Sequence, residues 1–60
     1  MAELSEKELS AIIDCLKEEE LLVKKFKMLA EHAEDDKVKN CFKEISDKHQ
    51  GHFNMLYNQL

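Results

Sequence analysis

The chain has few of the residues that break helices or build tight turns. Its 60 residues include no proline, no tryptophan and only one glycine, Gly51. Sheets made of short strands need turns rich in glycine and proline, so their scarcity argues against a β-sandwich or a barrel. No apolar stretch approaches the roughly 18 residues of a membrane span. The composition therefore predicts an all-α protein with no membrane partner.

Arginine is also absent, because all nine basic residues are lysine and the formal net charge is −4. Without guanidinium groups the chain cannot make bidentate contacts to phosphate or guanine, which disfavours nucleic acid as a partner. The segment Met1 to Leu4 lacks the basic and apolar regions of a signal peptide. We therefore expect a cytoplasmic protein.

What the chain does contain is a pair of helix signals. Ser5 and Glu8 fit a capping box, which starts a first helix at about residue 5. Its apolar periodicity persists to Ala33, and the acidic residues after it offer Asp35 or Asp36 as the N-cap of a second helix.

These signals predict a single helical-hairpin domain over 1–60. The first helix runs from about 5 to 33, the turn covers about 34–36, and the second helix runs from about 37 to 59. Gly51 lies inside the second helix, where glycine costs about 1 kcal/mol relative to alanine.

Each helix carries a stripe of apolar residues at alternating spacings of three and four, as in packed helices. The first stripe is Leu9, Ile12, Leu16, Glu19, Val23, Phe26, Ala30 and Ala33, and the second is Val38, Phe42, Ile45, His49, His52, Leu56 and Gln59. A carboxylate and two imidazoles therefore occupy central positions of the predicted seam. His32 falls on the polar face and is predicted to be a surface residue.

A register in which Ala33 faces Val38 sets Glu19 level with His52, with His49 one turn away. A carboxylate in the seam needs a compensating partner. Glu19 and His52 could form a polar pair that fixes the register, or they could share a metal ion with His49. The sequence leaves both readings open, so Glu19, His49 and His52 are candidate metal ligands.

The two cysteines, Cys15 and Cys41, have no metal-type spacing and are expected to be reduced. In the predicted register they lie about 22 Å apart along the hairpin axis, whereas a disulfide requires α-carbons within about 7 Å. An intramolecular disulfide is therefore excluded.

A hairpin this short cannot bury its own apolar surface, because chains below roughly 70 to 80 residues need a disulfide, a metal or oligomerisation. The apolar stripe of the first helix is also wider than a two-helix seam requires. These features predict a homodimer that forms a four-helix bundle, with two copies of the Glu/His set at its centre.

The spacing from Glu19 to Phe26 and the run His49-Gln50-Gly51-His52 resemble half of a ferritin-like, rubrerythrin-type bundle. With Phe53 and Tyr57 the second helix more closely resembles the coat-F family of spore-forming bacteria. That resemblance implies a spore-associated protein with no firmly assigned reaction, with spore coat proteins as partners. In the ferritin-like family a glutamate stands at the position of His49, so the site departs from the family pattern.

A di-iron site of that family uses four carboxylates and two histidines, whereas a dimer of this chain offers two carboxylates and four histidines. Such a set is nearer to what zinc, copper or nickel favours. The candidate cofactor is a transition metal, iron or zinc, and oxygen-activating di-iron catalysis is disfavoured.

Three functions follow from these observations. The first is a small non-enzymatic structural or assembly protein of ferritin-like type, whose polar core residues set the register and could hold a metal. The second is a metal-binding redox or storage protein with a degenerate di-metal site. The third is a helical module that docks a protein partner. No phosphate-binding loop or nucleophile elbow supports a conventional enzyme.

Overall fold

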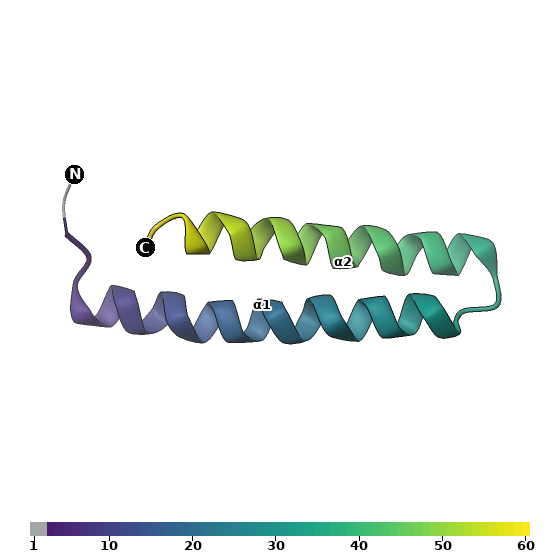
Figure 1. The fold of residues 1–60 in the computed structure, drawn as a ribbon, viewed down its shortest axis with the longest axis horizontal. Coiled ribbons are helices and arrows are strands. Elements are labelled where there is room, and N and C mark those ends of the chain that lie inside the picture. Colours follow the sequence, from purple (N-terminus) through teal and green to yellow (C-terminus); the bar gives the residue numbers. More distant parts are fainter. Residues whose placement is uncertain (1–2) are drawn as a thin grey trace.

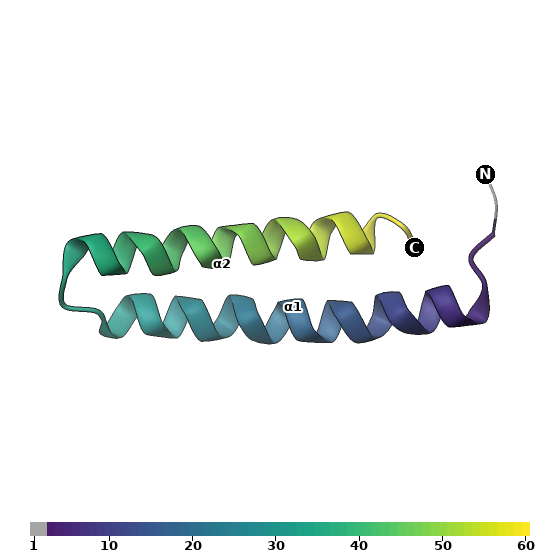
Figure 2. The same cartoon turned by 180° about the vertical axis from the view of Figure 1, so that it is seen from behind.

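The computed structural model describes residues 3–60, and over this range the chain is all-helical, with two helices and no strand. Helix α1 covers Glu6–His32 and helix α2 covers Asp36–Tyr57. The helices run antiparallel, side by side, as Figure 1 and the reverse view in Figure 2 show. The predicted all-α fold class is confirmed at this level. The predicted domain also includes Met1 and Ala2, which lie outside the described residues.

Helix α1 starts where the sequence places its cap. The Ser5 hydroxyl accepts a hydrogen bond from the backbone N–H of Glu8, and the Glu8 carboxylate accepts one from the backbone N–H of Ser5, each at 3.0 Å. The hydrogen bond from the Ser5 backbone N–H, with a smaller contribution from the Ser5 side chain, lowers the pKa of Glu8 below its usual range. This reciprocal capping satisfies two of the donors that a helix N-terminus leaves free.

The connection between the helices is Ala33 to Asp35 rather than 34–36. The Asp35 carboxylate accepts a hydrogen bond from the backbone N–H of Val38 at 2.9 Å and is the N-cap of α2. Helix α2 therefore begins one residue earlier than predicted, and it ends at Tyr57 rather than near 59. The connection thus keeps its predicted length but lies one residue earlier in the chain.

The most deeply buried of the described residues is a small polar one, Ser46, between the two helices. Its side chain is 2% exposed, and its hydroxyl donates a hydrogen bond to the carbonyl oxygen of Val23 at 3.2 Å. Val23 and Ala30 are the buried apolar residues of the described chain, at 7% and 4% exposed. Small side chains at these positions let the two backbones approach closely.

The hairpin leaves much of its apolar surface uncovered. Its Cα atoms span 47 × 17 × 10 Å with a radius of gyration of 14.4 Å, whereas a compact domain of this length has a radius of gyration of about 10 Å. Several large apolar side chains are between 38% and 67% exposed, namely Leu4, Leu9, Ile13, Leu21, Met28, Val38, Met55, Tyr57 and Leu60.

Neither described helix is long and apolar enough to cross a membrane.

Gly51 offers the first stability prediction. It lies inside α2 without a positive φ, and a Cβ added to it would meet nothing within 4 Å. Gly51→Ala should therefore raise the free energy of unfolding by about 1 kcal/mol, since alanine loses less backbone entropy in a helix. Thermal unfolding followed by circular dichroism measures the change. A lower melting temperature would contradict the open surroundings of Gly51.

Candidate metal centre

The two helices bring a carboxylate and two imidazoles together near the middle of the hairpin. Glu19 is the central residue of α1, with thirteen helical residues on each side of it. His49 and His52 are three residues apart on α2, so they project from neighbouring positions on one side of that helix. Among the described residues, Glu19, His49 and His52 each offer a ligand atom within 4.8 Å of the others.

The shortest interaction in this cluster joins Glu19 to His49. The Nδ1 atom of His49 lies 2.6 Å from Oε2 of Glu19, and the two side chains are 22% and 18% exposed. An ionised carboxylate can only accept, so Nδ1 carries the proton of this hydrogen bond. The imidazole also stacks on the Phe26 ring, with centroids 5.8 Å apart and planes 17° apart. Phe26 and Glu19 thus hold the His49 ring from two sides.

His52 has a looser place in the cluster. Its Nδ1 atom lies 3.4 Å from Oε1 of Glu19, and its side chain is 55% exposed. Its ring meets the His49 ring edge to face, with centroids 5.6 Å apart. His52 is therefore the exposed imidazole of the cluster, while His49 is partly buried.

This geometry corrects the expected roles of the two histidines. The sequence register made His52 the partner of Glu19 and placed His49 one turn away, beside Leu22. The structure places His49 closest to the carboxylate, at 2.6 Å, whereas His52 lies 3.4 Å from it. Phe26 contacts Phe42 and His49, which lie on either side of the expected Ile45 in the sequence of α2, with ring centroids 6.0 Å and 5.8 Å apart.

The donor set fits a single divalent transition-metal ion. Two imidazole nitrogens and one carboxylate oxygen are ligands of mononuclear zinc and ferrous sites, which keep further positions open. Donors bound to one zinc ion lie roughly 3 to 3.5 Å apart, so small side-chain rotations would bring the present 4.8 Å cluster into range. The set does not fit a carboxylate-bridged di-iron centre, because each chain contributes only one carboxylate to it.

An open hollow of about 420 Å³ adjoins the cluster. Its lining residues are Glu19, His52, Met55, Leu56 and Gln59. A ligand atom from outside the chain can therefore reach the carboxylate and the exposed imidazole. The third histidine, His32, is the last residue of α1 and is exposed, as predicted.

Both cysteines are free and exposed, which agrees with the expectation that neither forms a disulfide within the chain. Sequence reasoning missed Ser46, because the apolar repeat of the second helix passes beside it. The signal that could have identified it is a small residue beside the apolar stripe, because small side chains occur where two helices pack closely.

Comparisons with protein-family models, with curated proteins and with solved structures found no match to this chain.

Proposed function

We propose that this protein is a small non-enzymatic helical assembly protein that binds one divalent transition-metal ion per chain through Glu19, His49 and His52. The observation that carries the proposal is the convergence of their ligand atoms within 4.8 Å. A bound ion neutralises the Glu19 carboxylate and cross-links α1 to α2.

The chemistry of the cluster supports a metal over a purely structural polar pair. A structural polar pair would need only Glu19 and His49, which already share a 2.6 Å hydrogen bond. His52 adds a second imidazole at the same carboxylate, although more than half of its side chain is exposed. An exposed side chain contributes little to packing, whereas a third donor on the open side of the pair is what a metal ion requires.

The wider assignment is part of the same proposal. The protein works as a homodimer of ferritin-like type, in which two hairpins form a four-helix bundle, and it acts in the cell or in the spore of a spore-forming bacterium beside coat proteins. This part rests on the seam spacing and on two resemblances. Glu19 and Phe26 resemble the ferritin-like pattern, and the run His49 to His52 with Phe53, Leu56 and Tyr57 resembles the coat-F pattern. A stable monomer in light scattering would contradict the dimer.

Metal analysis tests the proposed site. Protein purified without chelators, or titrated with zinc, is expected to bind one ion per chain, and chelation should lower its melting temperature. The double variant His49→Ala/His52→Ala should lose the metal. Elemental analysis and isothermal titration calorimetry measure the stoichiometry and the affinity.

His32→Ala is the matched control, because His32 is an exposed histidine on α1 that lies outside the cluster. It should bind zinc as the unaltered protein does. Equal metal content in the unaltered protein and the double variant would refute the site. Absence of metal binding, with no change in melting temperature on chelation, would leave Glu19 and His49 as a register-fixing pair.

A redox or storage role is the less favoured function. Storage and oxygen chemistry in ferritin-like proteins depend on bridging carboxylates, and Glu19 is the single carboxylate in the cluster.

A further inference from the structure

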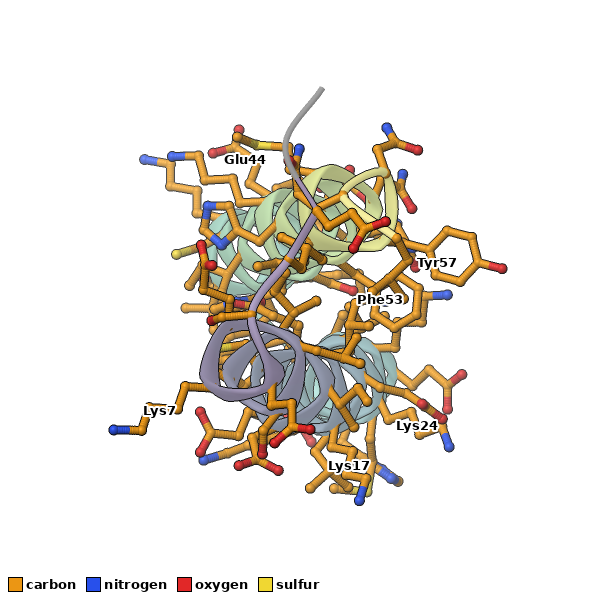
Figure 3. The ribbon with its side chains drawn as sticks, turned by 90° about the vertical axis from the view of Figure 1, so that its left-hand side faces the viewer. Lys7, Lys17, Lys24, Glu44, Phe53 and Tyr57 are labelled. Carbon is orange, nitrogen blue, oxygen red and sulfur yellow. The ribbon has the colours of Figure 1, made fainter. Side chains whose placement is uncertain are left out.

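The hairpin has two broad faces of different chemistry. Residues seven apart on a helix lie on the same side of it. The face that adjoins Glu19 and His52, here called the cluster face, carries the series Cys15, Leu22 and Leu29 on α1, and the series Cys41, Lys48 and Met55 with Ile45 on α2. Figure 3 looks along the hairpin and labels Lys24, Phe53 and Tyr57 together on the other side, here called the opposite face.

Charge distinguishes the hollows on these faces. Two hollows on the opposite face are rimmed by the charged residues Glu20, Lys24, Lys27, Glu31, Lys39, Lys43 and Asp47. The hollow on the cluster face has a single charged residue, Glu19, in its lining, while Lys7 and Glu44 are labelled elsewhere on that side in Figure 3. Cores of protein interfaces are depleted of charged residues and their rims are polar, so the hollow beside the cluster is the one that suits an interface core.

The exposed area matches the needs of a dimer. The chain exposes 5108 Å², whereas a compact monomer of this mass exposes about 4,100 Å². The excess is roughly 1,000 Å², and a stable interface covers about 800 Å² on each partner. One copy of the hairpin docked on one face would therefore bring this chain to the exposure of a normal folded domain.

The position of the cluster also suits a twofold partner. Glu19 is the central residue of α1. If two hairpins pack with their cluster faces together around a twofold axis at the middle of the interface, their two clusters lie opposite each other. This holds for a parallel and for an antiparallel pair of hairpins. Three donors leave at least one position of a tetrahedral ion open. The open side of the cluster is the side that a partner on this face would cover.

We infer that a second copy of this chain docks on the cluster face, so that metal binding at Glu19, His49 and His52 and dimerisation stabilise one another. The metal part of this inference rests on the proposed function. By linkage, because the dimer binds two ions, saturation with zinc tightens the dimer by the square of the factor by which dimerisation tightens each zinc site.

A pair of variants tests the face. Met55 and Tyr57 are 67% and 60% exposed in the last turns of α2, on the cluster face and the opposite face respectively. Met55→Lys should raise the dimer dissociation constant at least about tenfold, because it places a charge in the interface. Tyr57→Lys should leave the constant within about threefold. Sedimentation equilibrium over a range of protein concentrations, with zinc and with chelator, measures both.

The native cysteines provide a second readout that needs no destabilising variant. Cys15 and Cys41 are exposed in the single chain and lie on the cluster face. Their alkylation should slow at least about tenfold as protein concentration rises through the dimer dissociation constant. A cysteine introduced as Tyr57→Cys on the opposite face should keep its rate.

The outcomes separate the two proposals. Zinc bound equally by monomer and dimer would overturn the linkage and leave the proposed metal site intact. If no zinc binds, the proposed metal site fails, and the variant and alkylation comparisons in metal-free protein decide the docking face alone. A larger effect of Tyr57→Lys than of Met55→Lys, or cysteines that stay reactive in the dimer, would overturn the docking face.

Discussion

Phe26→Ala is expected to lower the free energy of unfolding by about 3 kcal/mol, the low end of the range for removing an aromatic ring from a core. The Phe26 ring lies between Phe42 and His49, with centroids 6.0 Å and 5.8 Å away. Its loss leaves a gap where the hairpin has few other apolar contacts. Urea unfolding at a fixed protein concentration measures the change.

Two controls sharpen this result. Phe26→Leu keeps most of the volume and should cost about 1 kcal/mol, because it loses the ring contacts and little burial. Leu21→Ala, at a position on the same helix that is 67% exposed, should change stability by less than about 0.5 kcal/mol. Similar losses for Phe26→Ala and Leu21→Ala would show that the contacts of Phe26 contribute nothing to stability.

The two histidines of the cluster are expected to differ strongly in metal-free protein. His49→Leu should cost about 2 kcal/mol, because it leaves the Glu19 carboxylate, 18% exposed, without its 2.6 Å hydrogen bond. His52→Leu should cost less than about 0.5 kcal/mol, since its side chain is 55% exposed and lies 3.4 Å from the carboxylate. Unfolding in the presence of a chelator measures both variants.

A double-mutant cycle isolates the Glu19 to His49 interaction. In a Glu19→Leu background, His49→Leu should lose most of its cost, which corresponds to a coupling of about 1 to 2 kcal/mol. Equal costs for His49→Leu and His52→Leu, or a larger cost for His52→Leu, would contradict the geometry and restore the pairing that the sequence register predicted.

Local signals in the sequence predicted the elements of the fold. The capping box of Ser5 and Glu8 lies within one helical turn, so its residues alone determine where α1 begins. Local signals could not decide whether Asp35 or Asp36 is the N-cap of α2, because the two residues are neighbours and have the same carboxylate. In the structure Asp35 is the N-cap, and its carboxylate accepts a hydrogen bond from the backbone N–H of Val38.

The pairing across the hairpin is a second feature that local signals leave open. In the structure His49 rather than His52 is the close partner of Glu19. The Ser46 hydroxyl is buried against the carbonyl oxygen of Val23. Register depends on contacts between residues more than twenty positions apart, and such contacts leave no periodic trace in the sequence.

The sequence by itself therefore determined that the chain is two amphipathic helices with a carboxylate and two imidazoles near the middle of one seam, because helix caps and periodicity are local properties. Tertiary structure alone decided which imidazole pairs with Glu19, how far each is exposed and which hollow of the hairpin is poor in charge. These features depend on how one helix slides and rotates against the other, which side-chain packing determines at a distance in the sequence.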